Sequence, residues 1–249
     1  MRRLAMQRGA TLIVVLIMLV LLTLVGTWAI RGSLTSLNIA MNTQAQALLQ
    51  QASDAIFFNL ENQTSDELTL AKMQIGDGML AYVLRPENKG KELVFCIRGG
   101  DANSLSGSRN ASVVYWEGSQ IKNTQLGTVG FCNIDQKADF ISGRSAVMTR
   151  VGIRAASNSQ DWEHLLEGDD PEMSKTQKIQ KVVVNVTSII PNLSSSSSSD
   201  IQACLSNYTS FVDSTVINNK TVSDCLKTNN VPYSNQEMEY TLKPVTGAS

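Results

Sequence analysis

The sequence predicts an α+β protein in which a long N-terminal helix, its first half embedded in a membrane, packs on an antiparallel β-sheet. Two observations lead to this fold class. A run of 21 uncharged residues, 10–30, passes into a helical pattern that continues far beyond it. After it come short segments rich in β-branched and aromatic residues, separated by clusters of Gly and Asn.

The N-terminal run has the length and the flanks of a membrane-spanning helix. Its 21 residues make about 31 Å of helix, against a hydrocarbon core of roughly 30 Å. Three basic residues precede the run, and Arg31 is the first charge after it. Because positive flanks stay in the cytoplasm, we expect the N-terminus inside and the chain after Arg31 outside. A secretory signal cut near residues 27–29 and a plain single-pass anchor remain alternative interpretations. The three basic residues are Arg2, Arg3 and Arg8.

The helix is expected to continue to about residue 62, because apolar residues recur at steps of three and four after the membrane run. No charged residue lies between Arg31 and Asp54. We expect the apolar stripe to lie on the globular domain and the opposite face, polar but uncharged, to be buried against sister helices rather than exposed to water. The stripe consists of Leu34, Leu37, Met41, Ala45, Leu48, Ala52 and Ala55, and the opposite face of Thr43, Gln44, Gln46, Gln50 and Gln51.

The remaining elements are predicted to be short strands. Alternation of side chains is clearest at residues 147–153 and 179–186, and Gly- and Asn-rich turns lie at residues 99–104 and 106–110. We expect an antiparallel meander with one face free to receive the helix. The predicted strands are residues 79–84, 93–97, 112–116, 146–153 and 178–190, with a last one at 240–245.

Composition divides the chain into five expected parts. Six consecutive serines, residues 194–199, cannot bury a core and predict a flexible linker. The parts are a leader at 1–9, the helix at 10–62 with 10–30 in the membrane, a β domain at 63–193, the Ser-rich linker at 194–200, and a small appendage at 201–249.

Four cysteines in an exported chain predict two disulfides, although four cysteines allow three connectivities. We expect Cys96 to pair with Cys132 and Cys204 with Cys225, because each pair lies within one expected unit. Each closed loop would add about 3 kcal/mol of stability. A metal site is the weaker interpretation, because the sequence has no Cys-x-x-Cys and a single histidine, His164.

The N-terminal pattern resembles that of type IV prepilins: a short basic leader ends in Gly9, and an apolar helix then outruns the membrane before a small β domain. Residues 8–26 in particular resemble the start of PilX-type minor pilins, and the resemblance covers about sixty residues. It implies that a prepilin peptidase cuts between Gly9 and Ala10 and that the new amine of Ala10 is methylated.

One residue departs from the pattern of major pilins. Those proteins carry a Glu at the fifth position after the cut, where its carboxylate offsets the amine of a neighbouring subunit, whereas this chain has Val14. An unpaired charge in an apolar bundle is expensive. A subunit at the tip has no neighbour ahead of it, so Val14 indicates an initiating or tip-proximal subunit. PilX-like minor pilins and the K-type pseudopilins of type II secretion share this neutral position.

Enzymatic and nucleic-acid-binding functions find no support in the composition. Loss of the three leader arginines would move the formal charge from −1 to −4, and no dense basic patch argues for nucleic acid. A nucleophile needs a base placed beside it, and no such motif is present. Residues 99–101 and 168–172 offer oxygen ligands but fit no calcium loop. We therefore expect no enzyme activity, no cofactor and no metal.

The expected function is assembly. A minor pilin of this kind would stay in the inner membrane with its C-terminal domain in the periplasm, and then move to the pilus tip on the cell surface. Its partners would be the prepilin peptidase, the pilus assembly platform, other minor pilins and the major pilin, in support of twitching motility or adhesion. The alternatives are a K-type pseudopilin of a type II secretion system and a membrane-anchored adhesin.

Overall fold

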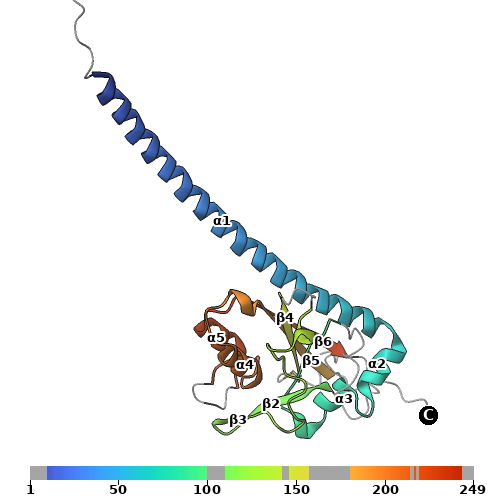
Figure 1. Cartoon of the computed structure of the whole chain (residues 1–249). Helices are drawn as coiled ribbons and strands as arrows, with labels where there is room; N and C mark the ends of the chain where they lie inside the picture. The colour runs from blue at the N-terminus through green and yellow to red at the C-terminus, as the bar shows by residue number, and fades with distance from the viewer. Residues whose placement is uncertain are drawn as a thin grey trace, which may run out of the picture. The chain divides into compact units, whose positions relative to one another are not determined.

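The computed structural model of the chain describes residues 10–99, 110–141, 146–156, 180–213, 216 and 219–242. By internal contacts the chain divides into two compact units, Met1–Ala45 and Gln46–Ser249. The first unit consists, where described, of one helical segment. The second contains the sheet and its covering helices (Figure 1).

The long helix α1 spans Ala10–Ser65, which is 56 residues. Residues 10–45 of this helix belong to the first unit and residues 46–65 to the second. The sequence-based boundary at residue 62 is therefore within three residues of the end of the helix. Asp66 follows as the N-cap of the next helix, where its carboxylate accepts the backbone N–H of Thr69 at 3.0 Å.

The second unit is built on a six-stranded antiparallel sheet with the order β3-β2-β1-β4-β5-β6. Two three-stranded meanders, β3-β2-β1 and β4-β5-β6, meet where β1 pairs with β4, so the α+β class is confirmed and the single meander becomes two. The strands are β1 Glu92–Cys96, β2 Ser112–Glu117, β3 Gln120–Lys122, β4 Met148–Ala155, β5 Gln180–Ile189 and β6 Tyr233–Leu242.

One face of the sheet, here called the helix face, is covered by the second part of α1, by α2 (Glu67–Gln74) and by α3 (Met79–Val83). Successive strand residues point to opposite faces, and the set that faces the helices is mostly aliphatic or aromatic, with buried hydroxyl groups at Thr149 and Ser188. Ile56, Phe57 and Leu60 of α1 close this core from above. The sheet supplies Leu93, Phe95, Val113, Val151, Ile153, Val182, Val184, Val186 and Leu242.

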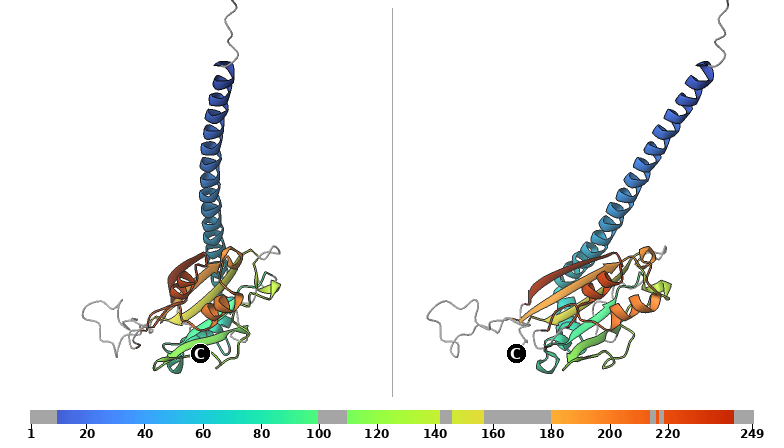
Figure 2. Two further views of the ribbon diagram at one scale, coloured as in Figure 1. Left: turned by 60° about the vertical axis from the view of Figure 1, so that its left-hand side comes forward. Right: turned by 90° about the vertical axis from the view of Figure 1, so that its left-hand side faces the viewer.

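The opposite face, here called the disulfide face, carries α4 (Ser198–Ser206) and α5 (Val222–Thr228) (Figure 2). A capping box begins α5: Thr221 and Asp224 exchange hydrogen bonds between side chain and backbone. These bonds to Thr221 lower the pKa of Asp224. Three short 3₁₀ turns complete the described elements: η1 Pro86–Asn88, η4 Lys137–Asp139 and η5 Pro191–Leu193.

Two predicted elements differ from the structure. Residues 79–84, expected as a strand, form the helix α3, because Gly78 serves as N-cap and a five-residue apolar run has no periodicity that separates helix from strand. The last strand, Tyr233–Leu242, begins seven residues before the predicted start at residue 240, and residues 243–245 of that prediction lie outside the described residues. Its polar sequence lacks the alternation by which the other strands are recognised.

The serine run is also different from the expected linker. Ser197 caps α4 by accepting the backbone N–H of Asp200, and Ser198 and Ser199 lie in its first turn. Serine is a strong N-cap, and this role overrides its usual association with flexible linkers. The segment after it is not separate from the β domain either, since all ten residues of β6 pair with β5.

Candidate functional site

The first unit presents a helix that is apolar on all sides. From Leu12 to Ile30 its large apolar side chains are between 49% and 81% exposed. By length and composition this helix is able to cross a membrane. A helix on a protein surface in water would have one polar face. This one has none, so its side chains require lipid or other helices around them.

The hydroxyl groups within the apolar run bond to their own helix. Thr23 donates to the carbonyl oxygen of Val20 at 2.8 Å, and Thr27 donates to that of Leu24 at 2.9 Å. Such bonds to the preceding turn satisfy the hydroxyl proton without water. Trp28 follows at 81% exposure, and Arg31 is the next charge. An exposed Trp just before a charged residue is typical of a membrane–water boundary.

Gly26 has open space around it in the described part of the chain. A Cβ atom placed on it would meet no other atom within 4 Å. Glycine in a helix interior costs about 1 kcal/mol relative to alanine. Small residues in membrane helices allow another helix to approach closely. Gly26 is therefore a position at which another helix is able to approach α1 closely.

The sequence-predicted processing residues lie at the start of this helix. Gly9 falls outside the described residues, and α1 begins at Ala10. Val14, the neutral fifth residue, is 59% exposed on α1. Nothing within the described chain pairs with it or covers it.

In the second unit α1 turns a different face to the sheet from the one predicted. Of the predicted stripe, Ala45 and Ala52 are half-buried, whereas Leu48 and Ala55 are exposed. The buried positions are Leu49, Ser53, Ile56, Phe57 and Leu60. The predicted stripe and the buried set both have helical spacing. The buried set faces the sheet because its side chains are larger and their burial removes more apolar area from water.

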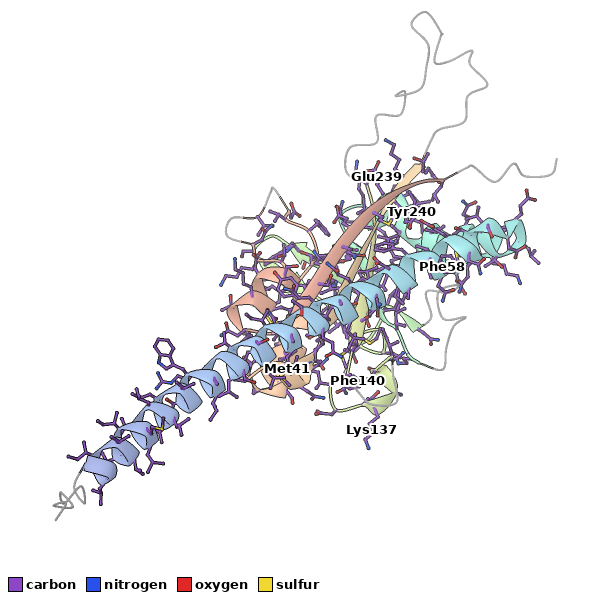
Figure 3. The ribbon with its side chains drawn as sticks, turned by 90° about the horizontal axis from the view of Figure 1, so that it is seen from above. Met41, Phe58, Lys137, Phe140, Glu239 and Tyr240 are labelled. Atoms are coloured by element: carbon purple, nitrogen blue, oxygen red, sulfur yellow. A yellow bond between two sulfur atoms is a disulfide. The ribbon has the colours of Figure 1, made fainter. Side chains whose placement is uncertain are left out.

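Residues on the far side of this part of α1 form a face without charge, here called the outer face and made of Leu48, Gln51, Ala55, Phe58 and Asn62, all of them exposed. Phe58 is 73% exposed, whereas its neighbour Phe57 is 6% exposed. Figure 3 labels Phe58 on α1. Exposed Phe58, together with Leu48 and Ala55 on a helix face without charge, makes this face a candidate surface for contact with another protein. Of the uncharged residues expected to meet sister helices, Gln51 lies on this outer face, and Thr43, Gln44, Gln46 and Gln50 are also exposed in the single chain.

The two acidic residues of this part of α1 point to β6 instead. Gln236 donates from Nε2 to Asp54 Oδ1 at 3.0 Å, and the Tyr240 hydroxyl donates to Glu61 Oε1 at 3.4 Å. Burial, and then the neighbouring Glu61 carboxylate, raise the pKa of Tyr240 to about 12. Both charges are therefore used within the domain, which leaves the outer face free of them.

The structure pairs the four cysteines as the neighbour rule predicts: Cys96 with Cys132, and Cys204 with Cys225. The first bond joins the end of β1 to the loop before η4. Beside it, Arg98 Nε lies 2.6 Å from Asp139 Oδ1. The second bond joins α4 to α5 on the disulfide face. Both disulfides belong to the same apolar cluster, so the predicted appendage shares a core with the sheet.

A buried ion pair, missed by sequence reasoning, fixes the segment after α4 to the disulfide face. Arg150 Nη2 of β4 lies 3.2 Å from Glu92 Oε2 of β1, and both side chains are fully buried. Arg150 also donates to the carbonyl oxygens of Leu205 and Tyr208, each at 3.1 Å. The backbone N–H of Ser210 donates to Glu92 at 2.8 Å. Directed bonds thus hold residues 205–210, which have no long regular element of their own.

Gly152 makes room for this pair. A Cβ on Gly152 would come within 1.8 Å of the Glu92 carboxylate. The only signal in the sequence was a pair of charged residues, Arg150 within one strand-like run and Glu92 at the start of another. Alternation places Arg150 on the face opposite to the predicted core, where a solvent-exposed side chain is the ordinary expectation.

No cluster of potential metal ligands is found among the described residues. They contain no group of three or more His, Cys, Asp or Glu side chains placed to bind a metal. His164 and residues 168–172 lie outside the described part, and so does Asp101 of the other oxygen-rich turn.

Comparison with protein families shows a similarity at the N-terminus. Residues 8–58, about a fifth of the chain, match the family described as PilX N-terminal. The match covers the apolar run, Val14 and most of the outer face, and it is consistent with a PilX-like minor pilin of type IV pili, a class of structural and typically non-enzymatic proteins. No curated protein and no solved structure matches the chain.

Proposed function

We propose that this chain is a minor pilin that takes part in the initiation and assembly of type IV pili at or near the filament tip. Pilus-dependent motility or adhesion would depend on it. The observation that carries the proposal is the all-round apolar helix from Leu12 to Ile30, which lies within the PilX N-terminal match and has no amphipathic face. Such a helix suits storage in the inner membrane, followed by transfer into a bundle of pilin helices.

The second part of α1 supports the same role. A filament built on helices needs a surface that meets neighbours after the helix has left the membrane. The outer face, with Phe58 and no charge, has this character. Desolvating uncharged amides and one aromatic ring costs far less than desolvating charges. The assembly platform, other minor pilins and the major pilin are the proposed partners.

Val14 supports a place near the tip. In a bundle of pilin helices, the fifth residue of one subunit lies near the N-terminal amine of its neighbour. Because Val14 is neutral, a neighbouring amine beside it would have no carboxylate partner. Removing one partner of a buried pair costs about 3–5 kcal/mol. A subunit that starts the filament presents its fifth residue to no amine ahead of it. Few copies per filament follow from this argument.

The first test is the position of processing. The mature protein should begin at Ala10, because Gly9 stands at the border between basic leader and apolar helix. N-terminal sequencing of membrane-extracted protein measures this, and it also detects methylation. A bulky substitution, Gly9→Val, should block the cut, and Gly26→Val serves as the matched control. A start near Ile30 would instead indicate ordinary secretion.

The second test is abundance and phenotype. Sheared pili should contain this protein at a small ratio to the major pilin, and Val14→Glu should be neutral or let the subunit enter the shaft more often. Loss of the protein should abolish surface pili while protein secretion continues. Abundance equal to that of the major pilin would overturn the tip assignment. Intact pili with failed secretion would favour the K-type pseudopilin, which shares a neutral fifth residue.

A further inference from the structure

The two edge strands of the sheet, β3 and β6, differ in length and composition. At one edge β3 has three residues and ends at Lys122. At the other edge β6 has ten residues, all of them paired in unbroken register with β5, and the strand contains no Lys, Pro or Gly. Natural sheets commonly protect an edge by keeping the strand short, by a bulge, or by a Lys or Pro residue. None of these three devices is present in β6.

The backbone of β6 has a second side that faces away from the sheet, here called the β6 edge. The amide of Ile190 donates to the carbonyl oxygen of Pro232 at 3.1 Å, and these two residues lie directly opposite each other in the register of β5 with β6. Bonded residues alternate along an antiparallel pair. The even-numbered residues of β6 therefore bond to β5, and no strand among the described residues pairs with the β6 edge. The residues whose N–H and C=O groups point outward along this edge are Tyr233, Asn235, Glu237, Glu239 and Thr241.

The side chains on the disulfide-face side of the β6 edge are acidic. Strand β6 contains Glu237 and Glu239 and no basic residue. Each of these glutamates has a cation of an inner strand beside it, Arg154 at 3.3 Å and Lys181 at 3.4 Å, and yet the two glutamate side chains are 45% and 50% exposed. Like charges on paired strands are destabilising. A second copy of β6 would bring four glutamates to one face, so a strand with basic residues fits this edge better.

On the helix-face side the β6 edge continues into the outer face of α1. Asp54 and Glu61 bond to β6, and Phe58 lies within one helical turn of both. Figure 3 shows β6 running along α1, with Phe58 on the helix and Tyr240 on the strand. Met238 points to the same side as Tyr240, because side chains two residues apart share a face, and it is 39% exposed. Aliphatic side chains of an added strand would therefore find apolar neighbours here.

We propose that the β6 edge is a binding site for one extended strand of another protein, in which basic and aliphatic residues alternate. The backbone of that strand continues the sheet by bonding to the outward-facing residues of β6. Its basic side chains lie beside Glu237 and Glu239, and its aliphatic side chains lie beside Met238. The proposal does not depend on the pilin role, because every contact that this chain makes in it lies within the second unit.

Amide hydrogen exchange in the detergent-solubilised full chain, followed by NMR, tests whether the β6 edge is free. The amides of Asn235, Glu237 and Glu239 point outward, whereas those of Gln236 and Met238 bond to β5. The outward set should exchange at least about tenfold faster than the inward set. Equal protection of the two sets would mean that another segment of the chain covers the edge, and the proposal would be wrong.

A synthetic peptide tests the chemistry of the occupant. The probe has the sequence Thr-Val-Lys-Val-Lys-Val-Thr, and the control peptide carries Glu in place of both Lys residues. The probe should slow exchange of the outward amides at least about threefold and leave the inward amides unchanged. The control peptide should slow neither set. Equal effects of the two peptides, or no effect of the probe, would contradict the proposal.

Two variants of one residue separate the backbone contribution from that of the side chain. Glu239→Pro removes an outward N–H, a change that an edge strand tolerates, whereas Glu239→Ala keeps the N–H and removes the carboxylate. Peptide protection of Asn235 and Glu237 should be lost in the Pro variant and retained in the Ala variant. Unchanged protection of the inward amides shows that the Pro variant keeps its sheet. Full peptide protection in a folded Pro variant would overturn the proposal, and if that variant does not fold, the comparison of the two peptides decides.

Discussion

The helix face and the disulfide face of the sheet are covered by different kinds of contact. On the helix face, α1 rests mainly on aliphatic and aromatic side chains, with one buried hydroxyl contact between Ser53 and Ser188 at 2.9 Å, and its polar bonds to β6 lie at the margin. On the disulfide face, residues 205–210 are fixed by a buried ion pair, by bonds to backbone atoms and by the nearby Cys204–Cys225 bond. Apolar contact has no direction, so it holds a regular helix well. An irregular segment needs directed bonds to define its path.

Breaking the buried ion pair should give the largest effect in this comparison. Arg150→Ala leaves the Glu92 carboxylate buried without its partner and two carbonyl groups without a donor. We expect a loss of about 3–5 kcal/mol in the free energy of unfolding, measured by denaturant titration of the detergent-solubilised full chain.

The double variant Glu92→Leu with Arg150→Met sharpens this prediction. Removing both charges in favour of apolar side chains of similar size is often neutral, so the double variant should be more stable than Arg150→Ala. If the two were equally unstable, the charges would contribute less than the backbone bonds that Arg150 makes to residues 205 and 208.

Adjacent phenylalanines test the helix face. Phe57→Ala removes a buried ring and should cost about 3 kcal/mol of unfolding free energy, whereas Phe58→Ala should stay within about 0.5 kcal/mol because its ring is exposed. Phe58→Ala should nevertheless lower the amount of protein recovered in sheared pili. A stability loss at Phe58 comparable to that at Phe57 would mean that the outer face is covered within the monomer.

The smallest effect concerns the margin between α1 and β6 at high pH. The pKa of Tyr240 is raised from 10.0 to about 12 in the folded chain. Its stabilising contribution is therefore complete below pH 10 and is lost as pH rises from 10 through about 12. Ultraviolet absorbance of tyrosinate should show one transition near pH 12 that Tyr240→Phe removes. Glu61→Gln should move that transition to lower pH, and no movement would exclude Glu61 as a cause.

Sequence patterns predicted what depends on period and length. The apolar run, the extent of α1 and the strands β1, β2, β4 and β5 are within a few residues of their predicted positions, because their side chains alternate or recur with a regular step. Both disulfide pairs follow from closeness in sequence. The face of α1 that meets the sheet was predicted wrongly, because two neighbouring stripes of α1 have helical spacing.

Other features depend on contacts between distant segments and have no local pattern. Arg150 looks like an outward-facing strand residue until residues 205–210 cover it. The polar sequence of β6 becomes a strand because β5 offers ten partners. The exposed Phe58 was not distinguished from the buried Phe57, since only the packed sheet separates them.

The pairing of α1 with β6 also constrains how the protein matures. Asp54 and Gln236 are 182 positions apart, and Glu61 and Tyr240 are 179 apart. Such distant contacts make folding slow, since the entropy of closing a long loop must be overcome before they form. While the chain is still being synthesised, the side chains of Ile56, Phe57 and Leu60 stay exposed until the sheet has formed. During that interval the second part of α1 exposes apolar side chains both on the face that later meets the sheet and on the outer face. A chaperone or the membrane surface would have to shield them.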